Sequence, residues 1–150
     1  MWSSIKSVKL SLICTRCVIV LVVACAVGLP KMMDRYLEYA GIYSNMMQAD
    51  PLMVILYVCC IPAMVALICL DRLLANIKRE EIFTDKNVKL LRIISWCCFA
   101  VSIIFACAGK YYLLFIAAAI AAAFIGLILR VVKNVIERAK EIKSENDFTI

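Results

Sequence analysis

The stretch Pro51-Leu-Met-Val-Ile-Leu-Tyr-Val-Cys-Cys-Ile-Pro-Ala-Met-Val-Ala-Leu-Ile-Cys-Leu70 decides the fold, because its twenty residues include no charged side chain. At a rise of 1.5 Å per residue, about 20 apolar residues in a helix cross a hydrocarbon core about 30 Å thick. We therefore expect this stretch to be a transmembrane helix. Pro62 predicts a bend in it, because proline has no N–H for the carbonyl of Val58.

Three further apolar segments of similar length accompany this stretch. The predicted spans are residues 10–29, 51–70, 92–109 and 111–130. The composition agrees, since 65% of the 150 residues are hydrophobic and 19% are charged, whereas a water-soluble chain is about half apolar and a quarter charged. The predicted fold class is all-α: one integral membrane domain, residues 1–150, that forms a polytopic four-helix bundle in contact with the lipid bilayer.

Arg16 interrupts the first span about 9 Å from its start, at the standard helical rise. Its guanidinium either reaches the lipid head groups along its own aliphatic chain or is a buried functional charge. At the other end of the bundle, Lys110 alone marks the turn between the third and fourth spans.

The basic residues predict the orientation of the chain. An even number of spans places both termini on one side, together with the loop between the second and third spans. That side holds fourteen of the seventeen Lys and Arg residues and eight of the eleven acidic ones, so the whole net charge of +6 lies there. Because Lys and Arg concentrate in cytoplasmic loops, both termini are predicted to be cytoplasmic. Basic residues interleaved with acids beside a bilayer argue against direct nucleic-acid binding.

Two helices are predicted to continue into the cytoplasm. Apolar residues from Leu70 to Ile77 follow the i, i+3, i+4, i+7 pattern of an amphipathic helix. A similar apolar stripe runs in the fourth helix from Ile128 to Ile142. The two stripes either pack against each other beside anionic lipid or receive a helix of a partner protein. The cytoplasmic parts are then loop 71–91 and the C-terminal helix and tail, residues 131–150.

Small residues recur at four-residue spacing in the fourth span, at Ala118, Ala122 and Gly126. Such spacing lets the backbone of another helix approach closely. The second helix belongs either to the same chain or to another copy in a homo-oligomer, and the sequence leaves both open.

The content of histidine and cysteine limits the chemistry. The chain has no His, which excludes imidazole general-base catalysis and His-ligated metal sites. Cys14 and Cys17 have CxxC spacing, but a membrane thiol oxidase also needs a second exposed pair, and the outer loop Lys31–Asp50 contains no cysteine. We expect no enzymatic activity, no cofactor and no metal, and we interpret the nine cysteines as packing residues.

Two stretches carry a resemblance to a known family. They are Leu70-Asp-Arg-Leu-Leu-Ala-Asn-Ile-Lys78 with Ile82-Phe-Thr-Asp-Lys-Asn-Val-Lys-Leu-Leu-Arg-Ile-Ile-Ser-Trp96, and the ending Glu145-Asn-Asp-Phe-Thr-Ile150. They resemble the bacterial membrane family catalogued as domain of unknown function family 2975, whose members are four-span proteins of about this length. Phe148 stands where the family usually has leucine.

The resemblance implies a location in the bacterial inner membrane and brings no established activity or catalytic residues. Genes of the family commonly neighbour one for a small Cro-type helix-turn-helix regulator, which implies a partnership. Within the segment Ile82–Trp96, the residue type and position of Thr84 also predict a helix start, because threonine is a favoured N-cap residue.

The leading hypothesis is a non-enzymatic regulatory membrane protein that binds a cytoplasmic partner, such as a small helix-turn-helix regulator, through hairpin 71–92 and the C-terminal tail. The alternative is a small channel or transporter subunit for an ion or an apolar solute, although spans two to four lack the mid-membrane charge usual in ion-coupled carriers. A third reading is an assembly factor for a larger membrane complex. The candidate partner-binding residues are Arg72, Asn76, Phe83, Thr84, Asn87, Arg92, Glu145, Asn146, Asp147, Phe148, Thr149 and Ile150.

Overall fold

The computed structural model describes residues 4–39, 46–79, 83–110 and 113–147. Within these residues the chain forms four long α-helices and no strand: α1 (Ser4–Tyr39), α2 (Met46–Lys78), α3 (Asp85–Ala108) and α4 (Leu113–Asp147). Each helix contains an apolar segment long enough to cross a membrane. The predicted all-α, four-span fold is confirmed, and the protein is a multi-pass membrane protein whose helices contact the lipid bilayer.

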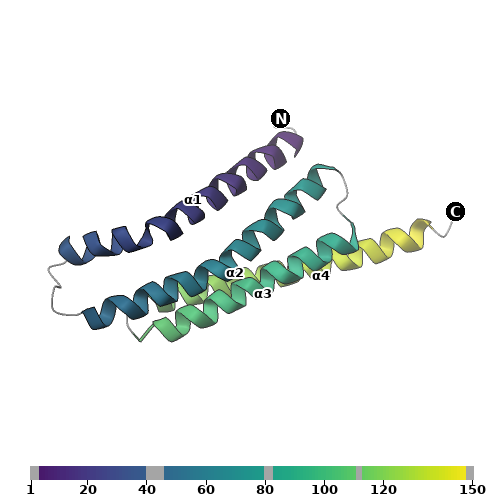
Figure 1. The fold of residues 1–150 in the computed structure, drawn as a ribbon. Helices are drawn as coiled ribbons and strands as arrows, with labels where there is room; N and C mark the ends of the chain where they lie inside the picture. Colours follow the sequence, from purple (N-terminus) through teal and green to yellow (C-terminus); the bar gives the residue numbers. More distant parts are fainter. Residues whose placement is uncertain (1–3, 40–45, 80–82, 111–112, 148–150) are drawn as a thin grey trace.

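The helices pack in chain order. Close backbone contacts in the described residues join α1 to α2, α2 to α3 and α3 to α4. Each helix runs back along the one before it, so the N-terminus, the α2–α3 connection and the C-terminus lie toward the same end of the molecule (Figure 1). Near that end, Leu129 and Ile136 of α4 pack against a buried cluster shared by α2 and α3, which consists of Cys69, Leu73, Leu91 and Ile94.

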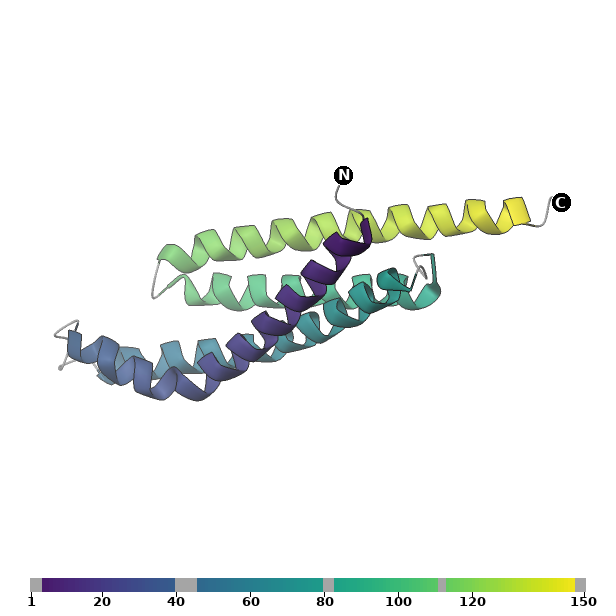
Figure 2. The same cartoon turned by 90° about the horizontal axis from the view of Figure 1, so that it is seen from above.

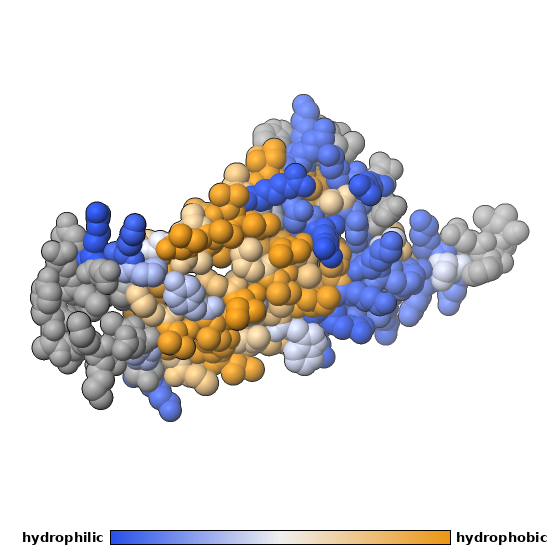
Figure 3. Space-filling model, in the orientation of Figure 1, coloured by the Kyte–Doolittle hydropathy of each residue, from blue (hydrophilic) through white to orange (hydrophobic). Residues whose placement is uncertain are grey.

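An apolar belt crosses the middle of the molecule. Figure 3 shows hydrophobic surface over the central part of the helices and hydrophilic residues at both ends, most extensively at the end that holds the α2–α3 connection. Of the described side chains of α1, Leu12 and Thr15 are the buried ones. Exposed apolar side chains of α1, such as Val20 and Val27, are available to lipid.

The helices are longer than the predicted spans. Helix α1 starts before residue 10, α2 continues to Lys78, and α4 continues to Asp147. Between α3 and α4, the tight turn predicted at Lys110 is present, and the N–H of Gly109 donates to the carbonyls of Phe105 and Ala106.

Helix α1 also continues through Pro30, beyond the predicted end of the first span. Proline has no N–H, so the carbonyl of Ala26, four residues earlier, loses its helical donor. The Tyr57 hydroxyl of α2 donates to this carbonyl at 3.1 Å. An unpaired carbonyl in hydrocarbon is costly, so the tyrosine stabilises a helix that proline would otherwise interrupt. Figure 2 shows that α1 bends along its length.

Two serines set the register between α3 and α4. Ser95 Oγ donates to the carbonyl of Gly126 at 2.9 Å, and Ser102 Oγ donates to that of Ala119 at 2.8 Å. The two serines are seven residues apart, as are the two residues that accept their bonds. Two helical turns on each side therefore match in an antiparallel pair.

Gly126 lies within this α3–α4 interface. A Cβ atom at this position would stand 3.3 Å from Cys98 Cβ, so glycine permits the close approach of the two helices. Of the other residues in the small-residue pattern, Ala118 and Ala122 are partly exposed, and the more deeply buried alanine is Ala119. The contact at Gly126 is intramolecular.

Candidate functional site at the charged end of the helices

Two of the candidate partner-binding residues face each other across the α2–α3 connection. Asn76 Nδ2 donates to Asn87 Oδ1 at 2.8 Å, and Asn87 is 1% exposed. A buried amide needs such a partner, because leaving it unpaired costs free energy. In this conformation the pair connects α2 to α3.

Thr84 occupies the N-cap position of α3, as its sequence position suggested. Its backbone is extended, with φ −118° and ψ 149°, and its carbonyl accepts hydrogen bonds from the N–H groups of Asn87 and Val88 at 3.1 and 3.2 Å. Its hydroxyl makes no capping hydrogen bond and is buried without a hydrogen-bond partner among the described residues. The hydrogen bonds to its carbonyl are the first of the helix, and the Thr84 side chain does not cap it.

The remaining candidates lie on the surface or outside the described residues. Arg72, Phe83, Arg92 and Glu145 are exposed. Asn146 and Asp147 belong to α4, but their side chains lie outside what the structure describes, as do residues 148–150 altogether.

An ion pair between Arg16 and Asp71 holds α1 against α2. Arg16 Nε lies 3.0 Å from Asp71 Oδ1, and the arginine side chain is 63% exposed. Asp71 directly follows the twenty-residue apolar stretch of α2. Arg16 is therefore level with the end of that apolar stretch and pairs with the acidic residue that follows it. This ion pair was not predicted from the sequence.

A second ion pair ties the C-terminal part of α4 to the beginning of α3. Lys140 Nζ donates to a carboxylate oxygen of Asp85, the first residue of α3. This hydrogen bond, together with the positive charge of Lys140, lowers the pKa of Asp85. The pair brings together segments 55 residues apart in the chain.

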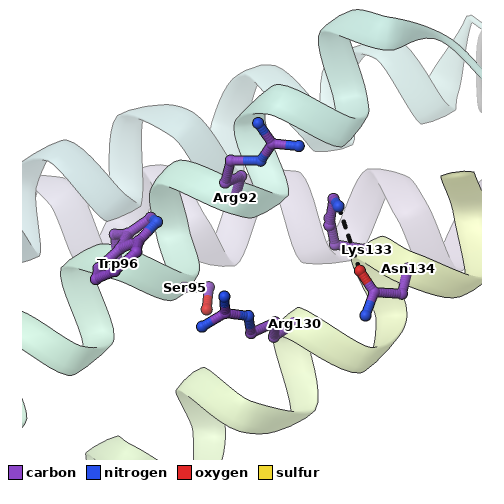
Figure 4. Close-up of a pocket in the computed structure, with 6 residues that line it drawn as sticks. All are labelled: Arg92, Ser95, Trp96, Arg130, Lys133 and Asn134. Carbon is purple, nitrogen blue, oxygen red and sulfur yellow. Dashed lines mark hydrogen bonds between the residues drawn. The ribbon is translucent and has the colours of Figure 1, made fainter.

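A polar cavity of about 280 Å³ lies between α3 and α4 (Figure 4), lined by Arg92, Ser95, Trp96, Arg130, Lys133 and Asn134. The guanidinium of Arg130 lies over the ring of Trp96, 5.8 Å from the ring centre. Lys133 Nζ donates to Glu137 and, at 3.2 Å, to Asn134 Oδ1. The structure thus gathers three cations at one place.

Sequence reasoning identified Arg92 alone among the six residues that line this cavity. The available signal was the arrangement at the ends of two spans: Arg92 precedes the third apolar segment, Trp96 follows one turn later, and Arg130 ends the fourth. Tryptophan and basic residues at a span end are typical of a membrane–water interface.

A second hollow, of about 480 Å³, lies between α2 and α3 and is lined by apolar residues. They are Pro51, Val54, Ile55, Val58, Ile103, Ile104, Cys107 and Ala108.

All nine cysteines are free thiols. In the described part of the chain, no three His, Cys, Asp or Glu side chains gather where they could hold a metal ion.

The comparison with protein families connects this arrangement to known sequences. The model of the family described as "Protein of unknown function (DUF2975)" matches residues 6–150. The chain belongs to this family. The match covers α1 of the DUF2975 protein from residue 6 onward and the whole of α2, α3 and α4, so the polar cavity between α3 and α4 lies inside the family domain. The resemblance seen in the sequence is confirmed. No curated protein and no solved structure matches this DUF2975 chain.

Proposed function

We propose that this DUF2975 protein is a non-enzymatic regulatory protein of the bacterial inner membrane that binds a cytoplasmic protein at the charged end of its helices. The partner that fits the family resemblance is a small helix-turn-helix regulator. Fourteen of the seventeen basic residues belong to this end, and such a bias is typical of the cytoplasmic side.

The observation that carries the proposal is the projection of α4. In both views, the C-terminal part of α4 extends beyond the α2–α3 connection (Figures 1 and 2). Lys140 pairs with Asp85 at the start of α3, and the helix then continues to Asp147. A helix that projects past its neighbours offers a free side to another protein.

The C-terminal part of α4, both beside α3 and beyond it, carries exposed apolar side chains. Val135 and Ile142 are 61% and 64% exposed, and their seven-residue spacing places them on one face of the helix. Apolar residues at such spacing are the anchors by which helices dock into grooves. The proposed partner helix or groove would cover these two side chains.

The α2–α3 corner supplies a second contact. Phe83 is 42% exposed there, and Arg72 on the preceding helix is exposed as well. An exposed aromatic ring and an arginine are the residue types that contribute most to binding at protein interfaces.

The experiment is co-purification of the full-length protein with a small Cro-type helix-turn-helix regulator, the partner that the family resemblance implies. Three variants reduce the docking surface: Ile142→Ser, Phe83→Ala and deletion of residues 145–150. Each is expected to reduce the retained regulator about tenfold or more, as for the loss of an anchor residue worth about 2 kcal/mol. The matched control is Phe124→Ala, because Phe124 is 62% exposed but lies in the apolar part of α4. Equal retention by all four variants and the wild type would refute the proposal.

A further inference from the structure

The polar cavity between α3 and α4 lies where the apolar segments of both helices end. Uncharged residues follow Arg92 in α3 and precede Arg130 in α4, and the Ser95–Gly126 hydrogen bond sets these two ends side by side. Trp96 is 61% exposed, as expected for a ring at the boundary between hydrocarbon and water. The cavity is therefore at the depth of the lipid head groups.

The cavity has an excess of positive charge. Arg92, Arg130 and Lys133 line it, and the nearest carboxylate is Glu137, which binds Lys133 and lies 3.8 Å from Arg92. The hydrogen bond from Lys133 lowers the pKa of Glu137, so this carboxylate is charged at neutral pH and balances one of the three cations. Two formal positive charges remain, and Arg130 has no carboxylate partner among the described side chains.

The donors are held in place before any ligand arrives. The guanidinium of Arg130 lies over the Trp96 ring, 5.8 Å from its centre, and this cation–π attraction favours its present position. Asn134 accepts a hydrogen bond from Lys133 through Oδ1, so its amide nitrogen is the group that can donate into the cavity. The Lys133 side chain is 13% exposed. A planar guanidinium beside an ammonium and an amide suits a phosphate, whose oxygens accept paired hydrogen bonds from arginine.

The volume restricts the ligand to a small group. Sites that enclose a whole drug-sized ligand measure about 300–1,000 Å³, and this cavity, with about 280 Å³, is just below that range. It suits a phosphate with its immediate substituents rather than a nucleotide.

We propose that this cavity binds the phosphate group of an anionic phospholipid of the cytoplasmic leaflet. Inorganic phosphate shares the chemistry, but the head-group depth of the cavity favours the lipid. The net charge of the cavity favours an anionic lipid over a zwitterionic one, as at other basic pockets between transmembrane helices. This ligand site is separate from the docking surface of Phe83 and Ile142.

Trp96 provides the reporter for the test. The chain has two tryptophans, so Trp2→Phe leaves Trp96 as the only one. This full-length protein in dodecyl maltoside micelles is titrated with phosphatidylglycerol, with phosphatidylcholine and with inorganic phosphate, while tryptophan fluorescence is recorded. We expect a saturable change with phosphatidylglycerol at a midpoint at least about fivefold below that of phosphatidylcholine. A saturable response to inorganic phosphate without one to phosphatidylglycerol would overturn the lipid assignment.

Charge variants separate this site from general attraction to an anionic surface. Arg130→Gln and Lys133→Gln each raise the phosphatidylglycerol midpoint about fivefold or more, and Arg130→Lys gives a smaller rise, because it keeps the charge and the fold but loses the planar fork. The control variants are Lys86→Gln and Lys89→Gln, which remove exposed cations from the same end outside the cavity. If the control variants weaken binding as much as the cavity variants do, the proposal is wrong.

Discussion

Replacing Tyr57 with phenylalanine is expected to destabilise the α1–α2 pair, because it removes the donor that replaces the missing N–H of Pro30. The affected bond joins the Tyr57 hydroxyl to the Ala26 carbonyl at 3.1 Å. Hydrogen bonds between transmembrane helices contribute about 0.6 kcal/mol on average and up to about 1.7 kcal/mol. The upper part of this range is expected here, because without the tyrosine hydroxyl the Ala26 carbonyl has no backbone N–H to replace it.

The assay is unfolding of the purified protein by titration with sodium dodecyl sulfate, followed by circular dichroism. The decisive comparison is the same substitution in a Pro30→Ala background, which restores a backbone N–H for the Ala26 carbonyl. In that background Tyr57→Phe should have almost no effect on the free energy of unfolding. An equal loss in both backgrounds would show that the tyrosine stabilises the protein for another reason.

The same titration tests the two interhelical contacts. Asn87→Ala leaves the Asn76 amide unpaired and should cost about 1–3 kcal/mol, whereas leucine at both positions should cost less. Gly126→Ala overpacks the α3–α4 interface and should cost about 1 kcal/mol, while Gly28→Ala, with nothing within 4 Å, should gain about 0.5–1 kcal/mol. The hydrogen bond from Lys140 lowers the pKa of Asp85, so this ion pair stabilises the end of α4 at pH values above 3.8, the usual pKa of the carboxyl group. The stabilisation is lost as the pH falls below 3.8 through the lowered pKa. Hydrogen exchange in 141–147, corrected for intrinsic rate, should then accelerate, and Asp85→Asn should abolish this pH dependence.

The four spans could be predicted from the sequence because hydropathy and length alone decide whether a helix crosses a membrane. The helix ends were less predictable. The predicted first span ends at residue 29, directly before Pro30, whereas α1 continues to Tyr39. The reason is a contact between distant segments: Tyr57 satisfies the carbonyl that proline leaves unpaired, and no local pattern around Pro30 reveals it.

The candidate site could be predicted only in part, because it too depends on contacts between segments that are distant in the chain. Asn76 and Asn87 are candidates because they lie in the stretches that resemble the family on the predicted cytoplasmic side, but the folded chain turns them toward each other and buries Asn87. The cavity combines residues from 92–96 and 130–134, and a single sequence shows two basic span ends without showing that they meet. The matched seven-residue spacing of serines in α3 and small residues in α4 is the pattern from which this register follows.

Both proposals require the end with the two termini to be cytoplasmic. The most direct measurement compares C-terminal fusions of the full-length protein to green fluorescent protein and to alkaline phosphatase, expressed in a bacterium. Fourteen of the seventeen basic residues belong to this end, so we predict a fluorescent first fusion and an inactive phosphatase. An active phosphatase with a dark fluorescent fusion would contradict the account, because the docking helix and the phosphate cavity would then lie on the outer side.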